Sequence, residues 1–342
     1  MNIVLYISEP LYQTEPYRQL TDYLSSLLPD GAHILHRGEI PVEPYSLVHF
    51  LGCPDLQMAR ALRRVSRQQV ATVFSPLGCL QPWVTHHHLT EAVRRVLLAK
   101  EAVMQADAIH AWSEAEIDTL DTLRWNSRVA LIPNAAVTQS ITAEEMARRF
   151  HTFYQKIIDS NAVRLLPAHL RHLVYGLLQI GLEPNLLHQE EVCRPIREAA
   201  SQCGNADWRI LMLFAYDERI TPYLHTGASR LGLAIPPFEI DAIDRYDAVA
   251  PYPDNDLPSE QDDNTSLLFS AIQQMVGEVR KHRAPLCHYA QLYQLLRHTD
   301  YDEQQLVQRL TKQHLYKATQ RLMEQMQTIT GLTEGYNPLA TL

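Results

Sequence analysis

Hydrophobic residues in the first 140 positions occur in short continuous runs, separated by longer stretches in which apolar positions recur at helical spacing. A continuous apolar run of this length is typical of a strand that helices cover on both faces, as in a parallel sheet. The pattern predicts an α/β, Rossmann-like parallel sheet domain over residues 1–140. The expected strands are 3–7, 33–36, 47–52, 69–74, 108–112 and 129–133, and the expected helices are 15–28, 55–67, 89–105 and 114–124.

From residue 141 to 342 the pattern changes to one that is mostly α-helical. Thr142 and Glu145 form a capping box, in which each side chain bonds a backbone N–H at the helix start, and apolar residues then recur at helical spacing. The apolar run WRILMLFAYDE, residues 208–218, indicates a single strand at 208–216 within this helical region. We therefore expect a sheet domain over 1–140 and a mostly helical region over 141–342.

Charge and composition narrow the class of protein. The chain of 342 residues has a formal net charge of -9, which gives no sign of a nucleic-acid-binding surface. The five cysteines are dispersed, and an odd number without a CxxC pair is typical of a reducing compartment. No basic leader or long apolar span is visible, so we expect a cytoplasmic protein without a transmembrane segment. No zinc spacing or phosphate-binding loop motif occurs, and we predict neither a metal nor a cofactor.

Candidate binding residues follow the expected strands. Ser75, Pro76 and Gly78 come directly after the strand that ends near residue 74, and Trp83 offers an aromatic face a few residues later. Glycine allows positive φ and lets a ligand approach the backbone closely. These residues indicate a loop that lines a cleft, although an ordinary turn beside a buried Trp explains them as well.

A second candidate position lies one strand further along the chain. Ser113 and Glu116 form a capping box directly after the expected strand 108–112. The helix that begins there has its N-terminus at the carboxyl edge of the sheet, where ligands bind in open α/β sheets. A carboxylate in this first turn also opposes the positive end of the helix dipole.

Three sequence blocks together resemble the first half of the family-4-type glycosyltransferases of the GT-B fold. The blocks are SPLGCLQPW at 75–83, ADAIHAWSEAE at 106–116 and IPNA at 132–135, in the order and at the spacing of that family. The resemblance implies a cleft loop that contains Ser75, Pro76, Gly78 and Trp83, with Ser113, Glu114 and Asn134 as further substrate-binding candidates. It assigns no catalytic residue in this chain.

The chain also departs from the family pattern. Leu77 stands where many relatives have a histidine, and Ala135 stands where the family has a glycine. The loop over 7–17 contains no glycine, which argues against a close approach of donor phosphates. After Asn134 there is no GxxxxxKG block to supply cations to a nucleotide diphosphate. The resemblance thus covers the first half of the chain only.

Two hypotheses about function follow. The first is a glycosyltransferase-like protein of bacterial type that moves a sugar from a nucleotide-sugar donor to a glycan or lipid-linked acceptor. The second is a catalytically degenerate homologue that acts as a binding or scaffold protein and meets a protein partner through its helical region. The missing cationic block favours the second hypothesis, and the intact SPLGCLQPW block favours retained ligand binding. Whether the chain is an enzyme stays open at this point.

Overall fold

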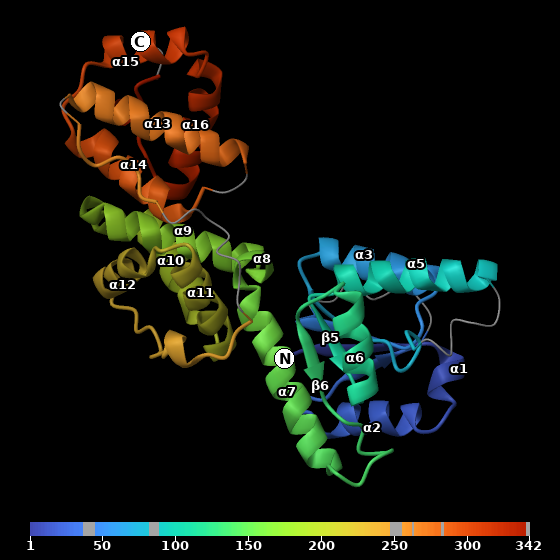
Figure 1. Cartoon of the computed structure of the whole chain (residues 1–342). Coiled ribbons are helices and arrows are strands. Elements are labelled where there is room, and N and C mark those ends of the chain that lie inside the picture. Colours follow the sequence, from blue (N-terminus) through green and yellow to red (C-terminus); the bar gives the residue numbers. More distant parts are fainter. Residues whose placement is uncertain (37–44, 82–88, 247–254, 262, 282–283, 340–342) are drawn as a thin grey trace. The chain divides into compact units, whose positions relative to one another are not determined.

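The computed structural model describes residues 1–36, 45–81, 89–246, 255–261, 263–281 and 284–339. Within the helix that begins at Leu89, side chains are described from Val96 onward. The chain divides into two compact units, which Figure 1 shows in full. The first unit comprises Met1–Leu165 together with a short later segment that begins at Ile243, and the second comprises most of the remaining chain.

The described part of the first unit contains a six-stranded parallel sheet with the order β2-β1-β3-β4-β5-β6. Its strands are β1 (Ile3–Ile7), β2 (His33–Leu35), β3 (Leu47–Leu51), β4 (Ala71–Ser75), β5 (Ala108–Ala111) and β6 (Val129–Leu131). Every residue of the four central strands is buried, as their continuous apolar runs predict, whereas the two edge strands are partly exposed. The predicted Rossmann-like α/β class is confirmed.

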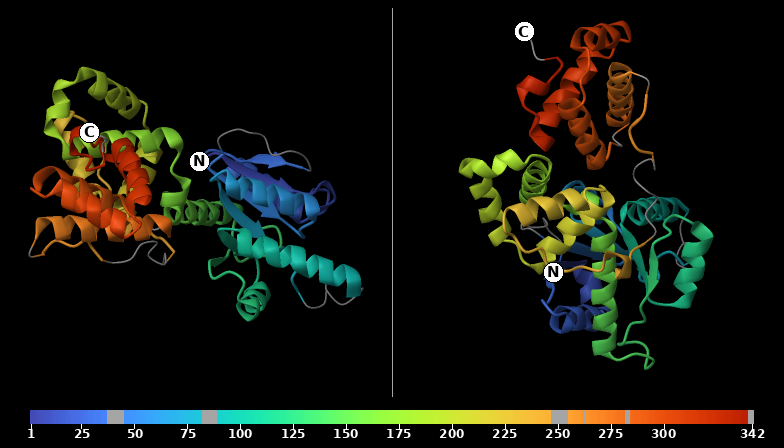
Figure 2. Two further views of the ribbon diagram at one scale, coloured as in Figure 1. Left: turned by 90° about the horizontal axis from the view of Figure 1, so that it is seen from above. Right: turned by 90° about the vertical axis from the view of Figure 1, so that its left-hand side faces the viewer.

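Helices cover both faces of this sheet, as Figures 1 and 2 show. Successive side chains of a strand point to opposite faces, so Val48 and Phe50 of β3 belong to one layer and His49 to the other. The layer with Val48 is covered by α3 (Leu56–Arg67), α5 (Leu89–Gln105) and α6 (Glu114–Leu123). The opposite layer is covered by α2 (Tyr17–Leu27) and α7 (Ala143–Ser160), which pack against each other, and the short α1 (Glu9–Tyr12) precedes α2.

Polar side chains fix the starts of two predicted helices. The hydroxyl of Ser113 accepts the N–H of Glu116 at 3.4 Å and begins α6, and that of Thr142 accepts the N–H of Glu145 at 3.2 Å and begins α7. Each bond satisfies one of the N–H groups that lack a partner within the first turn of a helix. Both starts agree with the capping residues identified in the sequence.

The compact first unit extends beyond the predicted limit at residue 140. Helix α7 packs on the sheet through buried Met146, Phe150, Tyr154 and Ile157, and the short α8 (Ala162–Leu165) follows it within the same unit. The sheet therefore needs α7 to cover its second face. This requirement is a matter of packing, which helical periodicity by itself does not reveal.

A segment from much later in the chain returns to the first unit. The ammonium of Lys156 lies 4.6 Å from the centre of the Tyr246 ring and 2.9 Å from a carboxylate oxygen of Asp244. The backbone N–H of Tyr246 donates to the hydroxyl of Ser160 at 2.8 Å. A cation over an aromatic face is attracted by the electrons of the ring, so these contacts hold the segment against α7.

The described part of the second unit is built from helices (Figure 2). They are α9 (Ala168–Leu182), α10 (Glu190–Ser201), α11 (Asn205–Asp217), α12 (Thr221–Arg230), α13 (Asn264–Arg280), α14 (Leu286–His298), α15 (Glu303–Lys312) and α16 (Tyr316–Thr330), with the short 3-10 helices η1 (Pro184–His188), η2 (Ile240–Ala242) and η3 (Glu334–Tyr336). No helix of either unit, over the described residues, is both long and apolar enough to cross a membrane.

The prediction of a strand at 208–216 is wrong, because these residues lie in helix α11. A short continuous apolar run fits a buried helix as well as a buried strand, and this helix buries Trp208, Leu211 and Phe214 among others. The local sequence signal for a helix was the pair of residues at its start, Gly204 and Asp207. The carboxylate of Asp207 accepts the backbone N–H of Gly204, the capping residue, at 2.9 Å.

Two glycines allow helices α9 and α12 to approach closely. A Cβ added to Gly227 of α12 would lie 2.0 Å from the carbonyl oxygen of Leu177, and one added to Gly181 of α9 would lie 2.2 Å from that of Tyr223. Backbone atoms cannot move aside as the end of a flexible side chain can. Only glycine is accommodated at these two positions.

We expect Gly227→Ala to destabilise the second unit by roughly 1–3 kcal/mol or more, because its methyl group would overlap the backbone of α9. The matched control is Gly277→Ala in α13, where an added Cβ meets no atom within 4 Å. Alanine should raise stability there by up to about 1 kcal/mol, since it is the better helix former. Urea unfolding followed by circular dichroism would measure both, and equal effects of the two substitutions would contradict the proposed close contact.

Candidate functional site

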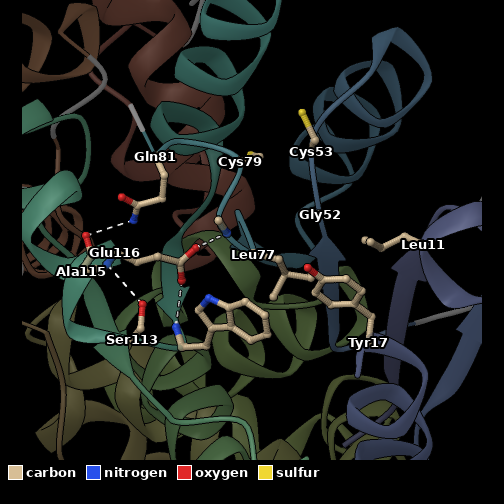
Figure 3. A pocket seen from close by; sticks show the side chains of 12 residues that line it. Leu11, Tyr17, Gly52, Cys53, Leu77, Cys79, Gln81, Ser113, Ala115 and Glu116 are labelled. Atoms are coloured by element: carbon tan, nitrogen blue, oxygen red, sulfur yellow. Dashed lines mark hydrogen bonds between the residues drawn. The ribbon is translucent and has the colours of Figure 1, made fainter. Parts of the chain in front are cut away.

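A cavity of about 440 Å³ lies in the first unit, at the carboxyl edge of the parallel sheet. Its walls come from the loops that follow β1, β3, β4 and β5 (Figure 3). The strand order changes direction beside β1, and this is the position at which open α/β sheets bind ligands. The lining includes Tyr17 after β1, Gly52 and Cys53 after β3, Gly78, Cys79 and Gln81 after β4, and Trp112, Ser113 and Glu116 after β5.

The loop after β4 enters the cavity wall through two residues with positive φ. Leu77 has a φ of 49° and Gly78 a φ of 85°. A Cβ added to Gly78 would meet no atom within 4 Å, so the glycine is required by its backbone conformation and not by lack of space. This conformation turns the N–H of Gly78 toward helix α6.

The buried carboxylate of Glu116 joins two loops of the cavity. One oxygen accepts the N–H of Gly78 after β4, and the other accepts the N–H of Trp112 after β5 at 2.9 Å. Burial raises the pKa of Glu116 above its usual value, and the hydrogen bonds from Trp112 and Gly78 oppose that effect. The sequence predicted that this carboxylate would serve the helix start alone, whereas it also fixes the loop after β4.

Gln81 provides a second link between the same elements. Its amide N–H donates to the carbonyl of Ala115 at 3.0 Å, and its amide oxygen accepts the hydroxyl of Thr119 at 3.2 Å. Gln81 is itself buried, so these bonds satisfy an amide that has little access to water. The first two turns of α6 are thus attached to the loop after β4 at two places.

An aromatic pair forms another part of the cavity wall. The rings of Tyr17 and Trp112 are stacked, with their centres 5.6 Å apart and their planes at 25°. Burial, together with the charge of Glu116, raises the pKa of Tyr17, so its hydroxyl stays protonated near neutral pH. Glu116 is the one charged side chain among the described residues of the lining, and none of them is a cation.

The structure divides the predicted site residues into three groups. Gly78 and Ser113 line the cavity. Ser75 and Pro76 are buried, and Glu114 is exposed on α6 outside the lining. Trp83 lies outside the described residues.

Asn134 also lies outside the cavity lining. It is buried, and its side-chain oxygen accepts the N–H of Ala136 at 2.9 Å, which shapes the turn after β6. Its side-chain NH₂ has no hydrogen-bond partner among the described residues. Asn134 thus has a role in the turn that the sequence block alone did not show.

Several lining residues were not singled out from the sequence. Tyr17, Cys53, Gln81 and Trp112 each lie within a few residues of a strand end or a helix start, on the edge where the sequence placed the site. A search of every strand-to-helix loop for aromatic and polar residues would have included them. The motif blocks cover the loops after β4 and β5. Tyr17 and Cys53 lie in the loops after β1 and β3, outside these blocks, and were therefore not identified.

A chain of buried polar groups runs beneath the cavity loops, on the sheet face that α7 covers. Ser75 Oγ lies 2.6 Å from His49 Nε2 and 2.6 Å from His110 Nδ1. His49 Nδ1 lies 2.7 Å from the hydroxyl of Tyr154, and His110 Nε2 lies 2.8 Å from the carbonyl oxygen of Ile132. Parallel pairing brings these residues of three neighbouring strands together.

The carbonyl of Ile132 fixes the direction of every hydrogen bond in this chain. A carbonyl can only accept, so His110 Nε2 donates to it, and because burial keeps the ring neutral His110 Nδ1 accepts the hydroxyl of Ser75. The Ser75 oxygen then accepts from His49 Nε2, and His49 Nδ1 accepts the hydroxyl of Tyr154. Both histidines are neutral in this arrangement.

Burial accounts for the neutral state of both rings. It lowers the pKa of His110 from its usual 6.5 to about 4, against the opposing effect of the hydrogen bond with Ile132. Burial, and the proximity of His110, lower the pKa of His49 well below the usual value. Ser75 is fully buried among these hydrogen-bonded groups, so a ligand in the cavity cannot reach it. Its role is to support the loop after β4.

The fold and the cavity define the class of the first unit. It is a Rossmann-like α/β unit with a ligand-sized cavity at the carboxyl edge of its sheet. No group of three or more His, Cys, Asp or Glu residues, among those described, is placed to hold a metal ion. Comparison with known protein families, with curated proteins and with solved structures finds no match to this chain.

Lowering the pH from 7 to about 4 should destabilise the first unit. In the unfolded chain His49 and His110 take up protons near pH 6.5, whereas the folded state keeps His110 neutral down to about pH 4. Stability that is fully present above pH 6.5 is therefore lost as the pH falls, by roughly 3 kcal/mol for His110 alone. Urea unfolding at a series of pH values would measure this loss.

The control for this experiment is His110→Gln, because glutamine can donate to Ile132 and accept from Ser75 without titrating. The variant should show a shallower pH dependence of unfolding, by about one proton. A dependence as steep as that of the unaltered chain would show that His110 is not responsible.

Proposed function

We propose that the first unit is a binding module of glycosyltransferase type that holds an uncharged, sugar-containing ligand in the cavity at the carboxyl edge of its sheet. The observation that carries this proposal is the position of the Glu116 carboxylate. It accepts the two backbone N–H groups, of Gly78 and Trp112, that the loops after β4 and β5 direct toward the start of α6.

Backbone N–H groups at a helix N-terminus are the usual binding place for phosphate. Here a carboxylate of the protein itself accepts two N–H groups beside the start of α6, and it brings a negative charge that repels a nucleotide diphosphate. The described lining adds no cation to offset this charge. A neutral ligand is therefore favoured over an anionic one.

The remaining lining suits the polar and apolar faces of a sugar. The rings of Tyr17 and Trp112 provide flat apolar area, and Ser113 provides a hydroxyl that can donate a hydrogen bond. Small-ligand sites in proteins commonly combine an aromatic surface with a few placed polar groups. A volume of about 440 Å³ is within the range of such sites.

The alternative is that the chain transfers a sugar from a nucleotide sugar to a glycan or lipid-linked acceptor. The three motif blocks support a common origin with such enzymes, and fold alone does not establish their chemistry. The second unit, where described, is helical and is the part proposed to meet a protein partner. Bacterial origin, a cytoplasmic location and the partner remain predictions from the sequence.

Calorimetric titration of the full chain with neutral sugars and with UDP- and GDP-sugars tests the proposal. We expect a neutral sugar or oligosaccharide to bind, and the matching nucleotide sugar to bind no more tightly. Trp112→Leu should weaken this binding by about tenfold, because it removes the aromatic face. Trp125→Leu is the matched control, since Trp125 lies in the same unit but outside the lining. Nucleotide sugars that bind far more tightly than their sugars, or that are turned over, would overturn the proposal.

A second prediction concerns Glu116 itself. Glu116→Gln leaves one of the two N–H groups facing an amide NH₂, so it should lower stability by roughly 1–3 kcal/mol. It also removes the negative charge, so weak binding of UDP or inorganic phosphate should appear that the unaltered chain lacks.

The matched control is Glu114→Gln, in the same helical turn but exposed, which should change neither stability nor phosphate binding appreciably. Phosphorus NMR and urea unfolding would provide the two measurements. If the unaltered chain binds UDP as tightly as the Glu116→Gln variant, the carboxylate does not exclude phosphate.

A further inference from the structure

Two cysteines from neighbouring loops lie together in the cavity wall. Cys53 follows β3 and Cys79 follows β4, and both line the cavity (Figure 3). The two strands are paired up to Leu51 and Ser75. Beyond this pair, the N–H of Gly52 donates to the carbonyl of Ser75 at 2.8 Å and continues the contact into the loops.

The thiols of Cys53 and Cys79 are close enough to share a hydrogen bond. Cys53 is exposed and Cys79 is partly exposed, so small oxidants can reach the pair. Both residues lie near glycines with positive φ, Gly52 at 96° and Gly78 at 85°, which shape the two loops. The pair thus combines proximity, access and placement on separate segments of the chain.

The other cysteines are arranged differently. Cys193 and Cys287 are buried in the second unit. Cys203 is partly exposed, and its thiol donates to the carbonyl of Ala199 at 3.3 Å, four residues before it in the chain. Of the five cysteines, Cys53 and Cys79 are the two that line the described cavity.

We propose that Cys53 and Cys79 are a redox modification site, at which a hydroperoxide converts the two thiols into a disulfide that joins the loops after β3 and β4. The Cys53 sulfur, as thiolate, attacks one oxygen of the peroxide. The O–O bond breaks, and water or an alcohol leaves, so Cys53 becomes a sulfenic acid. The Cys79 sulfur then attacks the Cys53 sulfur, the S–O bond breaks, and the departing hydroxyl group takes the proton of Cys79 and leaves as water. Two thiols are oxidised, and one peroxide is reduced.

The surroundings of the two thiols set this order. The hydrogen bond with Cys53, and then burial, raise the pKa of Cys79 well above the usual value, so Cys79 keeps its proton. Cys53 is the more exposed residue and therefore meets the oxidant first. Cys79 lies within reach to resolve the sulfenic acid before it is oxidised further.

The disulfide would lie in the wall of the cavity and would couple the two loops that line it. An effect of oxidation on ligand binding rests on the proposed function, whereas formation of the disulfide does not. In a reducing compartment a disulfide of this kind is transient and is reversed by thiol reductants, in contrast to a structural disulfide.

The experiment treats the full chain with hydrogen peroxide, blocks remaining thiols and maps tryptic peptides by mass spectrometry. We expect a peptide in which Cys53 and Cys79 are joined within one molecule, with a loss of about 2 Da that dithiothreitol reverses. No ligand is added, so failure of this result is distinct from failure of the proposed function.

Two variants complete the test. In Cys79→Ser the sulfenic acid at Cys53 has no resolving thiol, so labelling of Cys53 by dimedone should rise several-fold. Cys203→Ser, which alters a partly exposed cysteine outside the pair, should behave as the unaltered chain. Equal dimedone labelling with and without Cys79, or oxidation of Cys53 to the sulfonic acid while Cys79 stays free, would overturn the proposal.

Discussion

A carboxylate that is taken out of water needs donors around it, and Glu116 obtains two of them from two different loops. The N–H of Gly78 is available because the loop after β4 adopts positive φ, and the N–H of Trp112 is available because β5 ends there. The two loops and the start of α6 are therefore positioned by the same side chain. Loss of that carboxylate would weaken the attachment of both loops to α6, and Gln81 would then be the remaining link between α6 and the loop after β4.

A related dependence holds on the opposite face of the sheet. The alternation of side chains along β3, β4 and β5 places His49, Ser75 and His110 toward α7, where Tyr154 completes the hydrogen-bond chain. Because buried polar groups are costly unless they are paired, α7 must be in place for these strand positions to be satisfied. The sheet and α7 consequently form one unit, although the sequence suggests a boundary between them.

Much of the first unit follows from local pattern. Each expected strand is present, because a continuous apolar run such as residues 3–7 has few alternatives when short helices flank it. The apolar run at residues 208–216 forms a helix and not the predicted strand, because a buried helix can also be apolar on most sides. The starts of α6 and α7 were predictable because one capping residue determines each.

The sequence predicted at which edge of the sheet the candidate site lies, but not all the residues that form it. The edge of the sheet follows from topology, and Gly78 and Ser113 follow from turn and helix-start rules. The contribution of Tyr17 and the bridging by Glu116 depend on contacts between segments far apart in the chain. No local rule reports such contacts, because the partner is chosen by the packing of the whole unit.

Because the chain returns to the first unit at Tyr246, this unit is built from two segments that are far apart in the sequence. The ring of Tyr246 covers Lys156 of α7, yet helices α9 to α12 of the other unit are synthesised between these two residues. During translation the sheet unit can therefore form most of its contacts early, but its last contact waits for a large part of its neighbour. A cut after Leu165 would yield a sheet unit that lacks this contact, so the limits of the unit in space cannot be reproduced by one continuous fragment.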